Sequence, residues 1–189
     1  MATQKKSAKV STNKKTKKSD TGFYAQFFAL VERRGWFALT LPEIAKSTKT
    51  PLAELLEHFS DKPDILIQFG HGLDVHVADG MTESDEPIKD KLFDMIMRRF
   101  DALAVYRGGI VRLMDDMQVH PVGTVMLALE TLCGLHRSMA LMLEMAGISS
   151  SSPRALVAAV GLKIVYLSTL RTWKHDDSRD LSATMAILV

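Results

Sequence analysis

From Phe23 onward, large apolar side chains recur every three or four residues almost without interruption. This spacing places them on one face of an α-helix, whereas a strand needs alternating apolar and polar residues. No alternating run flanked by Asn-Gly or Asp-Gly indicates a β-hairpin. The sequence therefore predicts an all-α fold of about nine helices. Caps and breaks place them near residues 23–34, 41–47, 51–58, 62–77, 87–104, 110–117, 122–146 and 153–174, with a last helix from about residue 177.

The first 19 residues carry seven lysines and no acidic residue. The rest of the chain holds 17 basic and 22 acidic residues, so the formal charge of +2 combines a cationic segment with an acidic remainder. Val10 is the one large apolar side chain after Met1, too little to offset the entropy of ordering. We therefore expect residues 1–19 to be a disordered basic arm. Such an arm either improves solubility or lies along DNA phosphates or in a minor groove.

The single cysteine, Cys133, excludes an internal disulfide framework and favours a reducing compartment. No run of 18 or more uncharged apolar residues occurs, so we expect no membrane span. The lysine-rich start is not followed by the apolar stretch and cleavage site of a secretory signal. These features predict a cytoplasmic protein.

Residues 40–58 have the pattern of a helix-turn-helix unit. Thr40 and Glu43 form a capping box at the start of one short helix, with Pro42 tolerated in its first turn. After a turn at Thr48 and Lys49, Thr50 and Pro51 have the pattern of a second helix start. Two short helices joined in this way and supported by a third can place the second one in a DNA major groove.

Several segments of this region resemble the head of the TetR family of transcriptional regulators. They are Gly35-Trp36, Thr40-Leu41-Pro42-Glu43-Ile44-Ala45, Leu55-Leu56-Glu57-His58-Phe59 and Ser60-Asp61-Lys62-Pro63-Asp64-Ile65-Leu66. The resemblance covers about 45 residues and implies a three-helix DNA-binding head over residues 20–80. It implies phosphate contacts at Thr40 and Lys62, supported by Lys46 and Lys49. The positions facing bases would be Thr50, Leu52, Ala53 and His58.

The expected recognition helix also departs from the family pattern. Leu56 stands where the family commonly has a tyrosine, and Pro51 replaces a serine of the first turn. The helix has Glu54 and Glu57 and neither arginine nor lysine. Residues 20–80 contain five basic and nine acidic residues, a balance that opposes phosphate binding. Glutamate can nevertheless accept a hydrogen bond from cytosine N4, and the basic arm supplies charge of the opposite sign.

Residues 81–189 are expected to form a methionine-rich helical bundle for ligand binding and dimerisation. A methionine stripe is usually plain core, although it also adapts to irregular ligands. By the family resemblance, the bundle would hold an apolar small-molecule effector between its helices. The lining residues we expect are Phe93, Met97, Phe100, Leu113, Met117, Met126, Leu129, His136, Met139 and Trp173. For His136, an ordinary core histidine is the commoner explanation. The same resemblance implies a homodimer through the last two helices and a repressor acting on a double-stranded DNA operator.

The C-terminal segment suggests an alternative function. Tyr166 and the run from Asp176-Asp177-Ser178 to Thr184 resemble a segment of the ubiquinone-biosynthesis accessory proteins that share the TetR fold. That resemblance implies an isoprenoid-lipid-binding protein that does not read DNA. Catalysis has little support, because the sequence lacks a Gly-rich phosphate loop and a nucleophile elbow, and His175-Asp176-Asp177 is best explained as a capped turn. We expect neither enzyme activity nor a cofactor or metal.

Overall fold

The computed structural model describes residues 21–81, 85–149, 152–178 and 181–188, and the arm predicted over residues 1–19 lies outside them. The described residues form nine helices and no strand, which confirms the all-α prediction. The first helix covers residues 21–34 of this part of the chain. It is followed by α2 (Leu41–Thr48), α3 (Leu52–His58), α4 (Lys62–Asp79), α5 (Ile88–Ala104), α6 (Arg107–Val119), α7 (Pro121–Met145), α8 (Pro153–Trp173) and α9 (Ser182–Leu188).

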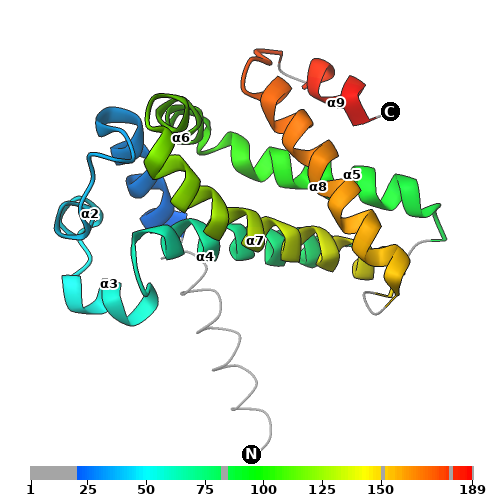
Figure 1. Cartoon of the computed structure of the whole chain (residues 1–189), viewed down its shortest axis with the longest axis horizontal. Coiled ribbons are helices and arrows are strands. Elements are labelled where there is room, and N and C mark those ends of the chain that lie inside the picture. Colours follow the sequence, from blue (N-terminus) through cyan, green and yellow to red (C-terminus); the bar gives the residue numbers. More distant parts are fainter. Residues whose placement is uncertain (1–20, 82–84, 150–151, 179–180, 189) are drawn as a thin grey trace, which may run out of the picture.

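The helices are arranged as a small head attached to a longer bundle. In Figure 1, the first helix, α2 and α3 lie at one end, and α4 and α7 run side by side along the molecule. α8 packs across α7 and leads to α9, which lies beside α8 at the upper right. α4 therefore belongs to both parts, because it begins in the head and continues through the bundle.

The head is built around apolar side chains from every one of its helices. The first helix ends at Gly35, whose φ of +80° lies in the left-handed region, and the Gly35 amide donates to the Val31 carbonyl at 2.7 Å. This is a typical glycine stop. The side chains at the centre of the head are at most 2% exposed: Phe27, Trp36, Ile44, Leu55 and Ile65.

α6 attaches the head to the bundle at two points. A Cβ at Gly109 would come within 2.4 Å of the Phe28 carbonyl oxygen, so glycine lets the first helix lie directly against α6. Near the other end of α6, one oxygen of Asp116 accepts a hydrogen bond from the Trp36 amide at 2.6 Å. The second oxygen accepts from Arg112 Nε at 2.9 Å. The turn that precedes the helix-turn-helix unit is therefore held by the bundle.

A buried polar network joins four helices inside the bundle. Asp74 of α4 forms an ion pair with Arg99 of α5, and both side chains are almost fully buried. The other Asp74 oxygen accepts from Ser138 Oγ of α7 at 2.6 Å, and Arg99 Nε donates to the Tyr166 hydroxyl of α8 at 3.2 Å. Each charge thus has a second partner, which the burial of an ion pair requires.

The last described helix begins later than the sequence predicts. We expected a start near residue 177, but α9 begins at Ser182. The cause is Asp176, whose carboxylate accepts from the Ser178 amide at 3.1 Å and from the Thr184 hydroxyl and amide at 2.7 and 2.8 Å. Hydrogen bonds from Ser178 and Thr184 hold the pKa of Asp176 far below its usual range. The Asp-x-Ser and Thr pattern of this segment therefore has a structural explanation.

α7 and α8 expose much of their apolar surface. Val122, Val125, Met126 and Leu129 of α7 are 60–82% exposed, and Leu156, Val157, Val160 and Ile164 of α8 are 41–73% exposed. The most apolar stretches of the two helices have mean hydropathies of 1.2 and 1.4 and are 22% buried. By length and composition both could cross a membrane, although the sequence has no uninterrupted apolar run. The same values suit helices whose exposed face packs against another protein.

Candidate nucleic-acid interface

The entry to α2 is fixed by a carboxylate that folds back onto the preceding residue. Glu43 Oε2 accepts from the Thr40 amide at 3.0 Å and from the Thr40 hydroxyl at 2.9 Å. The hydrogen bond from the Thr40 amide is the main cause of the lowered pKa of Glu43. Thr40 is exposed, as a phosphate contact requires, but its one hydroxyl proton is directed to Glu43. Its remaining lone pairs accept hydrogen bonds and cannot donate to a phosphate.

The turn between α2 and α3 is tight and exposes lysine. Lys49 has φ +56° and ψ +28°, the left-handed conformation that ends many helices. Thr50 N donates to the Ala45 carbonyl at 3.0 Å, and the half-buried Thr50 hydroxyl donates to the Thr48 carbonyl at 3.4 Å. α3 then begins at Leu52, directly after Pro51. The turn therefore has the length that the sequence predicts, with Lys46 and Lys49 exposed on either side of it.

α3 presents nearly all of its surface to solvent. Leu55 is the one buried residue among its seven, and it anchors the helix to the head. Leu52 and Leu56 are 40% and 49% exposed, and Ala53 and His58 are exposed as well. The base-facing positions expected on this helix, Leu52, Ala53 and His58, are therefore accessible.

The two acidic residues of α3 point outward as well. Glu54 and Glu57 are exposed, and neither forms an ion pair with Lys46, Lys49 or any other residue in the described part of the chain. They are three positions apart, so their carboxylates lie on neighbouring parts of one helix surface. The exposed surface of α3 is consequently apolar and acidic, which does not favour a DNA phosphate.

Lys62 has a different place from the one expected. Its Nζ donates to the carbonyl oxygens of Trp36 and Leu39, each at 3.0 Å, and lies 4.6 Å from the centre of the Trp36 ring. Burial lowers the pKa of this half-buried amine. Two of the three ammonium N–H groups therefore close the turn over residues 36–39, and the phosphate contact implied by the resemblance stays a prediction.

Several residues of the expected ligand pocket are packed in the core of the bundle. Phe100, Met139 and Trp173 are completely buried, and Met97, Leu113 and Met117 are half-buried against the core. Phe93 is half-buried as well. The Phe100 ring lies 5.9 Å from Trp173. Met126 and Leu129 differ from expectation, because they are 61% and 62% exposed on the outer side of α7. They cannot line an interior pocket of a single chain.

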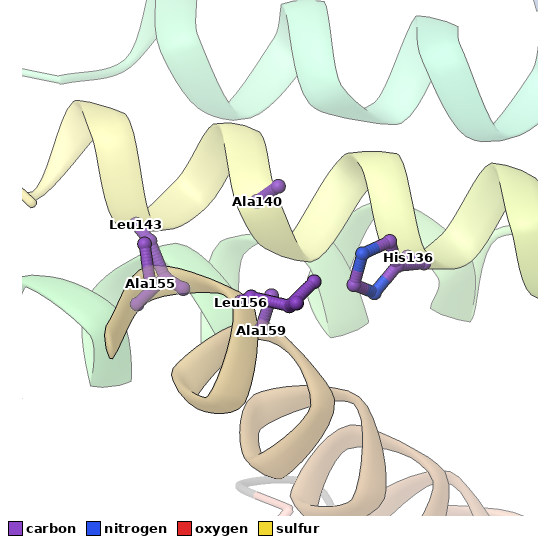
Figure 2. Close-up of a pocket in the computed structure, with 6 residues that line it drawn as sticks. All are labelled: His136, Ala140, Leu143, Ala155, Leu156 and Ala159. Carbon is purple, nitrogen blue, oxygen red and sulfur yellow. The ribbon is translucent and has the colours of Figure 1, made fainter. Parts of the chain in front are cut away.

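His136 of the expected set lies at a pocket, between α7 and α8. The pocket has a volume of about 80 Å³, and alanines line much of it: Ala140, Ala155 and Ala159. Figure 2 shows the His136 imidazole facing Leu156 and Ala159 across the gap between the two helices. Its Nδ1 is buried and has no hydrogen-bond partner among the described residues. The small alanine side chains create the space, and His136 supplies one polar group to it.

Sequence reasoning missed the polar groups that hold the head and the bundle together. Asp74, Arg99 and Asp116 were not singled out, although each is a charged residue within an apolar helix stripe. Such a residue signals a buried ion pair or a cap, since an unpaired charge is costly to bury. The identity of its partner depends on contacts between helices distant in sequence, which periodicity does not provide.

Solved structures of other proteins have the same arrangement of helices. No protein-family model and no curated protein matches the sequence. The TetR transcriptional regulator from Nitrosomonas europaea superposes with a TM-score of 0.65, over 89% of this chain and 92% of that one, at 20% sequence identity. A TetR transcriptional regulator from Rhodococcus sp. RHA1 gives a TM-score of 0.54, over 90% and 92% of the two chains, at 14% identity. This chain has the TetR fold.

The TetR fold accounts for the arrangement of the head and the bundle. It confirms the fold implied by the resemblance of the residues between Gly35 and Leu66. In this TetR-fold chain, the helix-turn-helix unit is attached to the bundle by α4 and by the Asp116–Trp36 contact.

The role of Lys62 can be tested by changing it to methionine, which keeps an apolar stem over Trp36. We expect K62M to lower the free energy of unfolding by about 1–3 kcal/mol, because two carbonyl groups lose their donor. Urea denaturation followed by circular dichroism measures this. The matched control is K46M at an exposed lysine, expected to change stability by less than about 0.5 kcal/mol. If the two variants are equally stable and only K62M binds DNA more weakly, Lys62 contributes a phosphate contact and not stability.

Proposed function

We propose that the protein is a homodimeric, cytoplasmic transcriptional regulator of the TetR type that represses by binding an operator. The accessibility of α3 carries this proposal. The capped start of α2 and the left-handed turn at Lys49 lead to a helix that is anchored by Leu55 alone and is otherwise exposed. A helix held in this way at the edge of a three-helix head has the geometry required to enter a major groove.

In this proposal, the DNA contacts are divided between the turn and the recognition helix. Lys46 and Lys49 approach phosphates, and the hydroxyl oxygens of Thr40 and Thr50 accept hydrogen bonds at the groove edge. Leu52 and Ala53 contact base edges or thymine methyl groups, and His58 lies at the end of the helix. Since Glu54 and Glu57 oppose phosphate binding, the seven lysines of residues 1–19 provide most of the favourable charge.

The first test is binding to DNA fragments that include the region upstream of the protein's own gene, measured at several salt concentrations. We expect sequence-selective retardation at low salt. Removal of residues 1–19 should weaken binding to all sequences and reduce the slope of log K against log salt by up to about 6, since each lysine neutralises at most one phosphate.

A full-length variant with these seven lysines changed to glutamine is the matched control, because it removes the charge and keeps the length. It should behave like the truncated chain. Absence of selective retardation with the arm intact would refute DNA reading. An unchanged salt slope after truncation would exclude a role for the arm.

The exposed apolar faces of α7 and α8 support a homodimer. Leu156, Val160 and Ile164 follow one another at intervals of four residues on α8, and the exposed residues of α7 form a similar stripe. Two copies of this helix pair would form a four-helix interface with a two-fold axis. We therefore propose α7 and α8 as the dimer interface instead of the last two helices, since the described α9 has only seven residues.

The effector site is proposed at the pocket beside His136. An apolar ligand there would contact the alanines of both helices and could accept or donate a hydrogen bond at the unpaired Nδ1. The volume of about 80 Å³ is well below the about 300–1,000 Å³ of ordinary ligand sites. Entry of an effector must therefore separate α7 from α8, and this movement would alter the dimer interface.

A second function is favoured by the same apolar faces together with the acidic surface of α3. In this alternative, the protein is a TetR-fold lipid-binding accessory protein that does not read DNA, as the resemblance of the C-terminal segment implies. The exposed apolar residues of α7 and α8 would then contact an isoprenoid lipid or a bilayer instead of a second chain.

Native mass spectrometry of protein purified without detergent distinguishes the two functions. We expect twice the mass of one chain for the unaltered protein, and the mass of a monomer for I164E, because a carboxylate in the interface must lose its water. The matched control is V119E, at a residue that is 72% exposed outside this face, and it should remain a dimer. A monomer carrying an apolar molecule would instead favour the lipid-binding function.

A further inference from the structure

We propose that the N-terminal arm of the protein docks on α3 of the same chain when no DNA is bound, so that the recognition helix is covered by its own lysines. The regulatory meaning of this contact rests on the proposed DNA-binding function. The docking surface is the solvent-exposed part of α3, which carries Leu52 and Leu56 on one side and Glu54 and Glu57 on the other. The occupant is the segment before Thr21, which lies outside the described residues.

The place where the described chain begins brings this segment close to α3. The ring of Phe23 stacks on the ring of Phe59, with centroids 5.2 Å apart and planes inclined by 21°. Phe59 directly follows the last residue of α3. Thr21 lies only two residues before Phe23, about 3 Å along the helix axis. The basic segment is therefore attached near the C-terminal end of α3.

The length of the segment is sufficient. Lys17 and Lys18 precede Thr21 by four and three residues, and an extended chain covers about 3.3–3.6 Å per residue. They can therefore lie within about 14 Å of Thr21. α3 is only about 10 Å long, since its seven residues rise about 1.5 Å each. The whole helix surface is within reach of the lysines nearest to the head.

The chemistry of the α3 face suits lysine in two ways. Glu54 and Glu57 are exposed and without an ion-pair partner in the described chain, and the first 19 residues contain seven lysines and no acid. Leu52 and Leu56 remain 40% and 49% exposed, and Leu56 is the sequence neighbour of Glu57. The four-carbon stem of a lysine can cover such an apolar surface while its ammonium group reaches a carboxylate. A phosphate backbone has neither an apolar stem for the leucines nor a positive charge for the glutamates.

This arrangement explains why a DNA-reading helix carries glutamates. In the absence of DNA, the carboxylates hold the lysines over α3. DNA competes for the same lysines, because its phosphates are more numerous and release counterions when they are neutralised. Transfer of the arm to DNA then exposes α3. When DNA binds too weakly to take the arm from α3, the recognition helix stays covered and does not contact the bases.

Carbodiimide cross-linking followed by mass spectrometry tests the contact without any DNA, because this reagent joins only amines and carboxylates that touch. We expect cross-links between lysines of residues 1–19 and Glu54 or Glu57 in the full chain. They should decline several-fold from 20 mM to 500 mM NaCl, since surface charge pairs are screened. In E54Q/E57Q the cross-links to α3 should disappear, and trypsin should cleave the arm several-fold faster.

Two controls make the result specific. D94N/D101N changes two exposed acids of α5 and should leave both cross-links and cleavage unchanged. A mixture of ¹⁴N- and ¹⁵N-labelled chains, after subunit exchange, should give arm–α3 cross-links within one isotope only. Mixed-isotope cross-links, or an arm cleaved equally fast in the unaltered protein and E54Q/E57Q, would overturn the proposal. If the cross-links form as expected but duplex DNA neither binds nor reduces them, DNA binding fails while the docking stands.

Discussion

The buried ion pair between Asp74 and Arg99 constrains the rest of the structure. Moving two charges out of water costs several kcal/mol for each ion, and their attraction compensates only when the remaining polar atoms are also bonded. Ser138 and Tyr166 provide those bonds. Since the four residues come from α4, α5, α7 and α8, the relative positions of these helices are fixed together. A change in one helix alone would leave a buried charge without a partner.

The buried network also constrains the head, because α4 belongs to both the head and the bundle. Ile65, near the start of α4, is part of the head core, and Asp74, two and a half turns later, is part of the buried network. Asp116 forms a second connection through the Trp36 amide, and Lys62 closes the same turn from the other side. The head therefore has a defined orientation on the bundle. A ligand that separates α7 from α8 would act on Ser138 and Tyr166, and so on the position of α4.

Local signals allowed the helices to be predicted from the sequence. α5, α7 and α8 were expected over residues 87–104, 122–146 and 153–174 and agree with the structure to within one residue at each end. Proline at the start of each helix, and Gly147 after α7, mark these boundaries without reference to the rest of the fold. The start of α9 was missed because it depends on Asp176 and Thr184, which are eight residues apart.

The candidate site was less predictable for two physical reasons. Lys62 donates to carbonyl groups more than twenty residues away in the sequence. The family resemblance predicted a phosphate contact for Lys62 and did not indicate these partners. Met126 and Leu129 show that an apolar stripe does not reveal what covers it. A helix face packed within the chain and one packed against a second chain have the same periodicity. The acidic residues of α3, by contrast, were visible in the sequence, although only the structure shows that Glu54 and Glu57 face outward.

We propose that two copies of this head read DNA together. Hydroxyl-radical footprinting of the full-length protein on its bound fragment tests this most directly. It should show two protected patches on one face of the duplex, related by two-fold symmetry, with centres about 34–36 Å apart or a multiple of that distance. Uniform weak protection, or a single patch of one half-site at saturating protein, would contradict a dimeric DNA-reading TetR fold.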